Sequence, residues 1–280
     1  MHQHLRCGRF NLSLNRPLIM GIVNLTDDSF SGDGLCGDSE RAIAQGLRLV
    51  REGADILDLG AESSRPGALP IDAQQELDRL LPVLAGLRDC GVPLSIDTLK
   101  PEVMRAVLAA GVDMINDIAA LRAPGALEAV AGSTAAVCLM HMQGAPQTMQ
   151  QAPHYADVVS EVTAFLVERV AAAEAAGIAS ERIVVDPGFG FGKSLEHNLA
   201  LLRRLAEFKS FGLPLLVGLS RKSMLGLLTG RAAGERLPAS LAAALLAVQR
   251  GAAIVRVHEV APLRDVLAVW EAAKDSSIPI

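Results

Sequence analysis

One unit recurs along the chain and constrains its fold more than any other feature. Each unit has a short run of β-branched residues and leucine, then a polar residue and a loop, then an amphipathic stretch. The runs that predict strands are Ile19–Asn24, Ile56–Gly60, Leu94–Asp97, Met114–Ile118, Val137–Met142, Ile183–Asp186, Leu215–Leu219 and Ile254–His258. The units average roughly 33 residues, which matches a strand–helix–strand module. An α/β chain with eight parallel strands is therefore predicted.

The stretches between these runs carry helical periodicity and helix-terminating residues. Ile43, Leu47 and Val50 recur at i, i+4 and i+7, so they line one face of a helix. Pro101 suits the first turn of another helix. Glycines suited to the residue after a helix stand just before three of the strands, as Gly53, Gly111 and Gly251.

Polar residues at the predicted strand ends distinguish two architectures. In an open doubly wound sheet, mainly the strands at the switch point need such residues, whereas in a closed barrel every strand end faces one mouth. Seven of the eight units carry a polar residue at or just beyond the strand end: Asn24, Asp97, Asn116, His141, Asp186, Ser220 and His258. This favours a single (β/α)8 barrel of the TIM type over residues 1–280, with residues 1–14 as an added hairpin or arm.

Composition excludes several classes of partner. The chain has 26 basic and 31 acidic residues, a net charge of −5, and only 3% aromatic residues, which argues against a general nucleic-acid or anionic-membrane binder. Its most apolar stretch, near Ala239–Val248, is too short to span a bilayer, and the N-terminus lacks an apolar signal segment. The four cysteines show no paired spacing. A cytoplasmic protein with reduced thiols is expected.

Two carboxylates end apolar runs and suggest a ligand site. Asp97 and Asp186 would be partly buried in a barrel, where each needs a basic partner, backbone donors or a ligand rich in N–H groups. With the amide of Asn116 and with Lys222, they would suit a flat heterocycle carrying several N–H donors and a carbonyl. Structural pairing of the two acids is an equally open alternative. The segment that follows Asp186 fits neither a P-loop nor a dinucleotide fingerprint, and its glycines predict a loop that a ligand approaches closely.

A second cluster is basic. Ser220-Arg221-Lys222-Ser223 follows a strand and opens a helix, which predicts an anion site, although helix capping by Ser220 or Ser223 would explain the same residues. Arg256 and His258 alternate on a strand and share one face. Together with Asn24 and Arg65 they could bind a phosphorylated group.

The long polar loops at 24–34 and 62–67 are typical of active-site covers. His141 alone is more often structural than catalytic, and motifs of zinc hydrolases or serine nucleophiles are missing.

Taken together and in order, these motifs resemble the dihydropteroate synthases, a pterin-binding family of the folate pathway. The similarity runs from about Pro17 to Ala273. The residues that carry it are Met-Gly-Ile-Val-Asn24-Leu-Thr26-Asp-Asp28-Ser-Phe30-Ser, Glu62-Ser-Ser-Arg65-Pro-Gly-Ala68, Ile-Asp97-Thr-Leu-Lys-Pro-Glu-Val103, Ile-Asn116-Asp-Ile118, Cys-Leu-Met-His141-Met-Gln-Gly144, Asp186-Pro-Gly-Phe-Gly-Phe-Gly-Lys193, Ser220-Arg-Lys222-Ser and Arg256-Val-His258.

The resemblance implies a TIM-barrel transferase that acts as a homodimer. It implies the condensation of 6-hydroxymethyl-7,8-dihydropterin diphosphate with 4-aminobenzoate, assisted by Mg²⁺, to give dihydropteroate and diphosphate, with sulfonamides as inhibitors. By motif, the pterin would be held by Asp97, Asn116, Asp186 and Lys222. The diphosphate would be bound by Asn24, Ser64, Arg256 and His258, with Asn24 also on the metal. The 4-aminobenzoate pocket and the closing loops would use Thr26, Asp28, Phe30, Arg65, Pro66, Phe191, Arg221 and Ser223. The catalytic group would be Asn24, Asp97, Lys222, Arg256 and His258.

Some positions depart from the family pattern. Asp27 replaces the usual proline of the first loop and leaves its backbone freer, Ser64 replaces threonine, and Leu99 replaces a polar residue. Gly32 and Asp33 stand in reversed order. These departures affect loop closure and affinity, and none removes a proposed catalytic group.

Two other functions remain open. A pterin-dependent methyltransferase on a related barrel would share the carboxylate and amide site but would have less use for the basic cluster. A non-catalytic pterin-binding protein would regulate or partner another protein.

Overall fold

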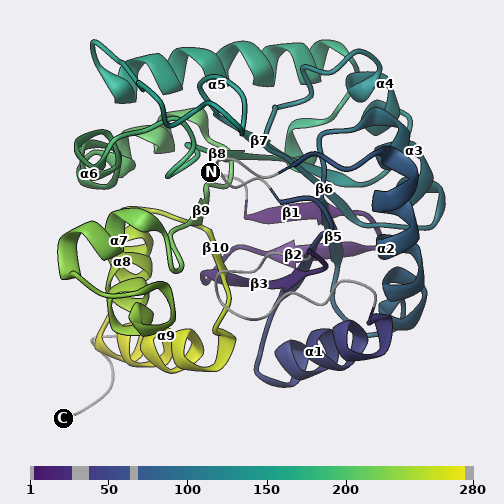
Figure 1. The fold of residues 1–280 in the computed structure, drawn as a ribbon, viewed down its shortest axis with the longest axis horizontal. Coiled ribbons are helices and arrows are strands. Elements are labelled where there is room, and N and C mark those ends of the chain that lie inside the picture. The colour runs from purple at the N-terminus through teal and green to yellow at the C-terminus, as the bar shows by residue number, and fades with distance from the viewer. Residues whose placement is uncertain (1–2, 27–37, 64–68, 275–280) are drawn as a thin grey trace.

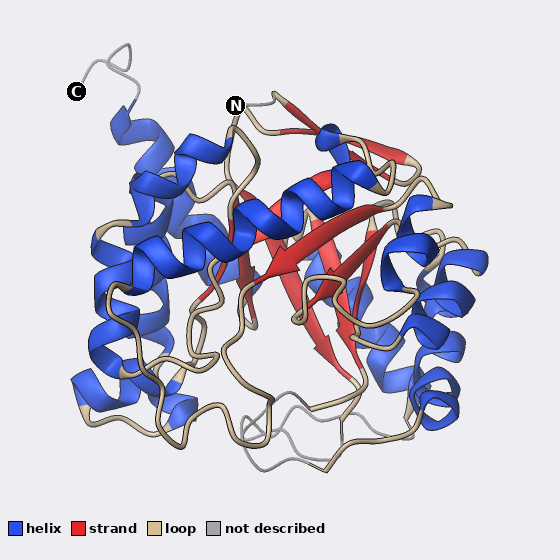
Figure 2. Ribbon diagram, turned by 90° about the horizontal axis from the view of Figure 1, so that it is seen from above, coloured by secondary structure: helices blue, strands red, loops and turns tan. Residues whose placement is uncertain are grey.

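The apolar runs form eight parallel strands that close on themselves. A computed structural model describes residues 3–26, 38–63 and 69–274. Its barrel strands are β3 (Leu18–Asn24), β4 (Ile56–Gly60), β5 (Leu94–Asp97), β6 (Met114–Asp117), β7 (Ala136–Met140), β8 (Ile183–Asp186), β9 (Leu216–Gly218) and β10 (Ile254–Val257). They pair in the order β8-β7-β6-β5-β4-β3-β10-β9, and a bridge between Val185 and Leu215 joins the two ends. The predicted TIM-type barrel is confirmed, with the helices outside the strands (Figure 1; Figure 2).

The helices follow the predicted pattern. Those that the structure describes are α1 (Ser39–Arg51), α2 (Ala73–Leu87), α3 (Pro101–Ala109), α4 (Ala126–Ala131), α5 (Val158–Ala175), α6 (Leu195–Arg203), α7 (Ser223–Thr229), α8 (Leu237–Gln249) and α9 (Val260–Lys274). Pro101 opens α3, as expected. Glycines follow α1, α3 and α8 with φ of +98°, +90° and +107°, angles that side chains with a Cβ rarely adopt. Ile43, Leu47 and Val50 of α1 pack on the barrel's outer core.

The strand after α3 ends earlier than the sequence predicts. Ile118 lies outside β6, because the Asp117 carboxylate captures two backbone N–H groups beyond the strand. Its oxygens accept from the N–H of Ala119 and of Leu121, each at 2.7 Å. Ala120 and Leu121 then take positive φ, and the chain turns away from the sheet. The prediction missed this turn because Asp117 sits inside an otherwise apolar run.

An antiparallel hairpin covers the N-terminal end of the barrel. It consists of β1 (His4–Cys7) and β2 (Phe10–Ser13), paired in register. The buried side chains of Leu5 and Cys7 pack against residues inside the barrel, among them Met20 and Met114. The hairpin therefore closes this end, and the opposite, C-terminal end remains for a site.

Arg9 at the hairpin turn fixes the hairpin to the barrel. Its Nε and Nη2 donate to the carboxylate of buried Asp113 at 3.0 and 2.9 Å, and its backbone N–H donates to the same carboxylate at 3.1 Å. The Arg9 side chain is 44% exposed, so solvent screens the ion pair.

We expect Arg9→Ala to lower the free energy of unfolding by about 1–2 kcal/mol, because Asp113 loses two charged donors. Urea denaturation measures this as a lower midpoint with an unchanged slope. Arg6→Ala is the matched control, since Arg6 pairs with Glu181 at a more exposed place. Equal losses for Arg6→Ala and Arg9→Ala would contradict the role given to Arg9.

Candidate active site

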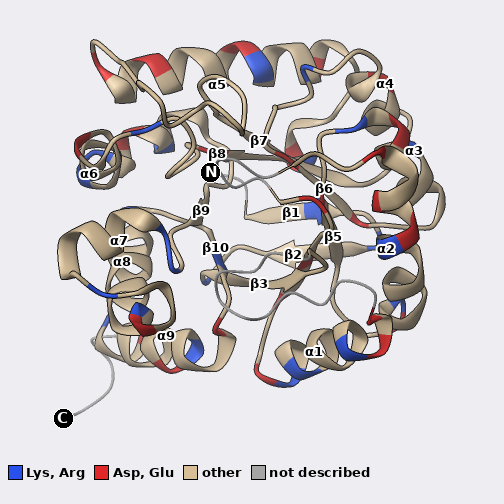
Figure 3. Ribbon diagram, in the orientation of Figure 1, with Lys and Arg blue, Asp and Glu red and all other residues tan. Residues whose placement is uncertain are grey.

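The C-terminal ends of the strands bring the predicted pterin residues to one rim. Asp97 ends β5 and lies in register with Asn116 of β6, and Asp186 ends β8. Lys222 follows β9, and Arg256 lies on β10. Basic residues on β10 and on the segment between β9 and α7 are visible in Figure 3. Residues far apart in sequence thus share one end of the barrel, as the strand-end pattern predicts.

Five predicted site residues lie outside the described residues: Asp28, Phe30, Ser64, Arg65 and Pro66. The same holds for the departures Asp27, Gly32 and Asp33. Asn24 ends β3, and Thr26, which is buried, follows it. Leu99 packs with Phe191 against a buried cluster of Ile118 and three methionines, so its apolar side chain has an apolar environment.

Arg256 bridges two carboxylates. Its Nε donates to Asp58 Oδ2 at 2.6 Å, and its Nη2 donates to Asp97 Oδ2 at 3.0 Å. The amide Nδ2 of Asn116 donates to the same Asp58 oxygen at 3.1 Å. Four side chains from β4, β5, β6 and β10 therefore form one connected network. One oxygen of Asp97 accepts a hydrogen bond from Arg256, as expected if the acid has a structural role. The other oxygen of Asp97 lies outside this ion pair.

Sequence reasoning missed Asp58. It stands between Leu57 and Leu59 in the interior of a predicted strand, whereas the strand-end pattern singles out only residues at the ends of strands. A signal was present, because an ionisable residue inside an apolar run costs free energy unless a partner compensates it.

The environment of Asp97 makes its charge sensitive to pH near neutrality. Burial raises the pKa of Asp97 to about 7, against the opposing effect of Arg256, and Asp58 raises it further. The carboxylate is therefore ionised above pH 7 and increasingly protonated below it. A protonated Asp97 cannot accept two N–H donors from a heterocycle.

We expect the affinity for a pterin to fall as the pH drops below about 7, because binding then requires Asp97 to lose its proton. The pKa of Lys222 is about 8, so Lys222 is already charged at pH 6 and does not supply the released proton. Burial also raises the pKa of Asp186, so the Asp97→Asn variant is needed to assign the proton to Asp97. Calorimetry at pH 6 in buffers of different ionisation enthalpy measures that proton. Asp97→Asn should remove the effect, and pH-independent binding between pH 6 and 8 would contradict it.

Asp186 and Lys222 form the other side of the rim. Asp186 Oδ1 accepts from the N–H of Gly188 at 2.7 Å, and burial raises the pKa of Asp186 while nearby Lys222 opposes the shift. Burial lowers the pKa of Lys222 to about 8, and Asp186 counteracts this. The Lys222 ammonium donates to the Phe189 carbonyl and lies 4.6 Å from the centre of the Phe191 ring. Lys222 thus stands between a carboxylate and an aromatic ring.

The glycines after Asp186 have a structural reason that differs from the predicted one. A Cβ on Gly188 would come within 1.9 Å of the His141 carbonyl oxygen, and one on Gly192 within 2.5 Å of the Gln143 carbonyl oxygen. Both glycines also have positive φ. The close approach is therefore made by the protein's own backbone after β7, and this packing fixes the loop that carries Phe189 and Phe191.

A buried lysine supports this loop. Lys193 Nζ lies 2.9 Å from His141 Nδ1 and donates to the carbonyls of Gly188 and Phe191 at 2.9 and 3.0 Å. Burial lowers the pKa of His141 to about 3, with Lys193 adding to the shift, so the ring is neutral. The interpretation of His141 as structural agrees with these contacts.

The basic turn after β9 is bonded to the segment after β10. Ser220 Oγ lies 2.9 Å from His258 Nδ1, and the Arg221 guanidinium pairs with Glu259. The alternative of capping by Ser220 or Ser223 is not observed: the N-cap of α7 is Lys222 and no side chain caps it. Ser223 is the first residue of α7 and is exposed.

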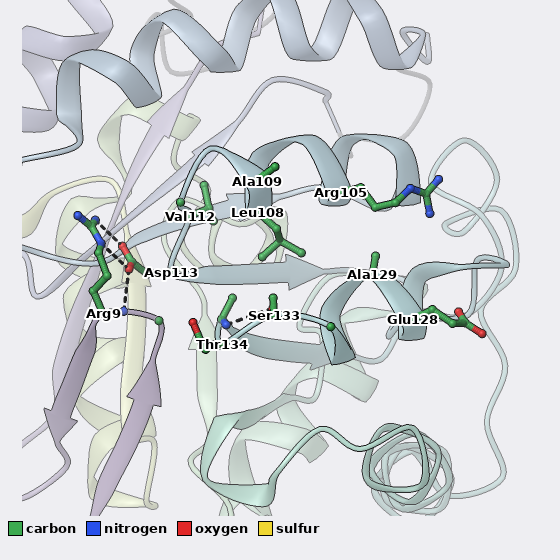
Figure 4. Close-up of a pocket in the computed structure, with 14 residues that line it drawn as sticks. Arg9, Arg105, Leu108, Ala109, Val112, Asp113, Glu128, Ala129, Ser133 and Thr134 are labelled. Atoms are coloured by element: carbon green, nitrogen blue, oxygen red, sulfur yellow. Dashed lines mark hydrogen bonds and ion pairs between the residues drawn. The ribbon is translucent and has the colours of Figure 1, made fainter.

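A groove of about 540 Å³ lies elsewhere on the molecule, between α3, α4 and the hairpin turn. Figure 4 shows Arg9 and Asp113 at one end of it and Arg105 and Glu128 at the other. It contains none of the predicted site residues. Arg9 and Asp113 satisfy each other there, so the groove is not the candidate active site.

A closed barrel that gathers carboxylates, an amide and basic side chains at its C-terminal mouth defines an enzyme that recognises a small polar ligand. The sequence pattern of the family described as "Pterin binding enzyme" matches residues 20–258, and the chain belongs to this family.

Similar proteins specify the branch of the family. The chain is 52% identical to the dihydropteroate synthase of Neisseria meningitidis serogroup B, over 97% of this chain and 98% of that protein. A Yersinia pestis dihydropteroate synthase in complex with a sulfonamide drug superimposes with a TM-score of 0.94 at 44% identity, over 98% of this chain and 100% of that one. A Xanthomonas albilineans dihydropteroate synthase with 4-aminobenzoic acid gives 0.91 at 52% identity, over the full length of both chains. The chain is thus a transferase of the dihydropteroate synthase type.

Proposed function

We propose that the chain condenses 6-hydroxymethyl-7,8-dihydropterin diphosphate with 4-aminobenzoate to give dihydropteroate and diphosphate. The observation that carries this is the single rim where Asp97, Asn116 and Arg256 are connected and where Asp186 lies beside Lys222. Such a rim offers acceptors for the N–H groups of a pterin and a donor for its carbonyl. The family's synthase branch supports the same reaction.

The pterin would lie between the two acids. Asp97 and Asp186 would accept its ring N–H groups, Lys222 would donate to its carbonyl, and Asn116 would complete the edge. Buried carboxylates that gain charged or N–H partners from a ligand recover part of their desolvation cost, which favours binding of this heterocycle over an apolar one.

The leaving diphosphate would be bound by Arg256, His258, Ser64 and Asn24. Each of the first two already has a partner that holds it in place, Asp58 for Arg256 and Ser220 for His258. Preorganised donors stabilise charge that develops on a leaving group without having to reorient during the reaction.

Asn24 fits a Mg²⁺ ion shared with the diphosphate. Mg²⁺ takes oxygen ligands, retains several waters and is commonly bound by one or two protein groups together with substrate phosphates. Among the described residues, the Asn24 side chain forms no hydrogen bond, so its carbonyl oxygen is available as a ligand. Within the same part of the chain, no cluster of three or more His, Cys, Asp or Glu side chains could hold a metal. When bound, the ion would neutralise charge on the departing diphosphate.

Calorimetric binding of diphosphate with and without Mg²⁺ tests the role of Asn24. Asn24→Ala should remove the part of the diphosphate affinity that depends on Mg²⁺.

The reaction would be dissociative, with diphosphate leaving before the carbon–nitrogen bond forms. An arylamine is a weak nucleophile with little need of a base, and the electron-rich pterin can stabilise the cation at its methylene carbon. Asp97 and Asp186 would face this developing charge, so catalysis is positioning plus electrostatics. The test is the rate with ring-substituted aminobenzoates under conditions where chemistry limits turnover. A steep dependence on nucleophilicity would contradict the proposal.

The second substrate would bind beside Phe191, Arg221 and Ser223, under the loops that carry Thr26, Asp28, Phe30, Arg65 and Pro66. Phe191 is partly exposed next to Lys222, which places an aromatic surface beside the pterin region.

We expect sulfonamides to inhibit competitively, because they resemble 4-aminobenzoate and the Phe189-Gly-Phe191 segment carries no insertion. Initial rates at several concentrations of 4-aminobenzoate measure this. The apparent inhibition constant should rise linearly with the concentration of 4-aminobenzoate and remain unaffected by Mg²⁺. An inhibition constant independent of 4-aminobenzoate would exclude the shared pocket.

The decisive experiment incubates the purified protein with both substrates and Mg²⁺ and follows diphosphate and dihydropteroate. Formation of both in equal amounts supports the synthase. Pterin binding without product would favour the non-catalytic alternative, and transfer of a methyl group from a methylated pterin would favour the methyltransferase.

A homodimer is proposed for the assembly. Helix α8 contacts both α7 and α9. Large apolar side chains are exposed on these three helices: Leu227 (70% exposed), Leu228 (52%), Leu246 (39%) and Val269 (71%). The Ala- and Leu-rich composition of α8 agrees with an interface there. Light scattering should give twice the 29.4 kDa of the chain, and Leu227→Glu should shift it toward the monomer.

None of the described helices is long and apolar enough to cross a membrane. Among the described cysteines, Cys7, Cys90 and Cys138 are free thiols. Together with the lack of paired cysteine spacing in the sequence, these thiols support a cytoplasmic location.

A further inference from the structure

Asp58 of β4 is fully buried below the rim and belongs to none of the groups assigned to substrate. Its Oδ2 accepts from Arg256 Nε at 2.6 Å and from Asn116 Nδ2 at 3.1 Å. Its Oδ1 is buried and has no hydrogen-bond partner among the described residues. A buried carboxylate with one unsatisfied oxygen destabilises the fold, so its presence calls for a compensating role.

The Asp58 carboxylate determines how the guanidinium of Arg256 is divided between Asp58 and Asp97. Arg256 places Nε on Asp58 and Nη2 on Asp97, one nitrogen on each acid. Without a carboxylate at 58, both of these nitrogens would be free to pair bidentately with Asp97, which is the strongest arrangement for an arginine and a carboxylate. Asp97 would then have less capacity to accept N–H groups from a pterin.

The same carboxylate sets the orientation of Asn116. An ionised Asp58 only accepts hydrogen bonds, so the Asn116 amide must turn its NH₂ group toward Asp58. The Asn116 carbonyl oxygen is then directed away from Asp58. One buried acid therefore fixes both a basic and an amide side chain that the proposed function places on the pterin diphosphate.

We propose that Asp58 is a positioning residue for the pterin diphosphate: it anchors Arg256 through Nε, orients Asn116, and keeps Asp97 available as an acceptor. This rests on the proposed function. Because Asp58 acts only through these neighbours, its loss should affect one of the two substrates and leave the other unaffected.

The test compares Asp58→Asn with the wild type in steady-state kinetics and in calorimetric binding of the pterin diphosphate. We expect kcat/KM for the pterin substrate and the affinity for it to fall about 10–100-fold, the loss typical of a hydrogen bond to a charged group. The KM for 4-aminobenzoate should stay within about twofold of the wild-type value, because the hydrogen bonds that Asp58 makes with described residues go to Arg256 and Asn116.

A double-mutant cycle separates positioning from general damage. In an Arg256→Lys background, which lacks the Nε donor, Asp58→Asn should cost much less than it does alone. Asp113→Asn is the matched control: Asp113 is equally buried but lies at the hairpin end, so it should lower stability and leave the kinetic constants near wild type. Asp58→Glu serves as a second variant if Asp58→Asn does not fold. We expect it too to weaken binding of the pterin diphosphate and to leave the KM for 4-aminobenzoate near the wild-type value.

Equal losses for both substrates, additive losses in the cycle, or losses that match those of Asp113→Asn would overturn the inference. Failure of the proposed function is a separate result, because it would show as a wild-type protein that forms no dihydropteroate. Calorimetry of the pterin diphosphate reports on Asp58 even then.

Discussion

Arg256→Ala should lower kcat/KM by an amount equivalent to about 2–4 kcal/mol of transition-state stabilisation, the cost of removing one preorganised oxyanion donor. Arg256 contacts Asp58 and Asp97 at 2.6 and 3.0 Å, so the diphosphate would meet a guanidinium already held in place. A second effect acts through the fold, because the substitution leaves buried Asp58 and partly buried Asp97 without their cation. Breaking a buried pair in this way costs about 3–5 kcal/mol of stability.

The two effects are separable by measurement. Thermal and urea unfolding report the stability loss, and single-turnover rates on the folded fraction report the loss at the leaving group. Arg256→Lys retains the charge but not the fork of donors, so its rate should lie between those of alanine and wild type. Arg231→Ala is a suitable control, since Arg231 is exposed and its Nη1 lies 3.9 Å from the exposed carboxylate of Glu235. Near-wild-type turnover by folded Arg256→Ala would contradict a role on the diphosphate.

The rim could be predicted from the sequence because parallel strands align their ends. A polar residue that follows an apolar run must appear at the C-terminal mouth once the barrel closes, whatever the details of packing. This rule alone predicts the position of three residues, and the structure places all three at the C-terminal mouth: Asp97, Asn116 and Asp186. The boundaries of the strands were predictable to within one or two residues. The predicted strands extend too far at Ile118 by one residue and at Met142 by two, since β6 ends at Asp117 and β7 at Met140.

Contacts across the barrel could not be predicted in the same way. Asp58 and Arg256 are 198 positions apart, and their contact depends on the stagger of strands around the closed sheet. The reason for the glycines after Asp186 was equally hidden, because the segment that contacts them follows a different strand. The local sequence pattern predicts which end of the barrel carries the site. The closure of the sheet into a barrel determines which side chains come into contact.

Asp186→Asn should reduce the affinity for the pterin by about 2–3 kcal/mol, because a charged acceptor is replaced by a group that is half donor. Asp186 Oδ1 already accepts from the Gly188 N–H, so the other oxygen is the less engaged acceptor for the ligand. In the variant, the amide must keep its oxygen on Gly188 and turn its NH₂ toward the ligand. That NH₂ would face the ring N–H groups of the pterin, donor against donor.

Lys222 adds a diagnostic readout to this substitution. The carboxylate of Asp186 supports the charge on Lys222, so its loss should lower the pKa of Lys222 below its value of about 8. A Lys222 that loses its proton near neutrality would donate only a weaker, uncharged hydrogen bond to the pterin carbonyl. The affinity of the variant should therefore begin to fall at a lower pH than that of the wild type. Glu207→Gln, at an exposed position on the outer surface, should change neither quantity. Unchanged calorimetric affinity in folded Asp186→Asn would remove Asp186 from the pterin site. A weaker affinity with an unchanged pH dependence would keep Asp186 on the ligand but separate it from Lys222.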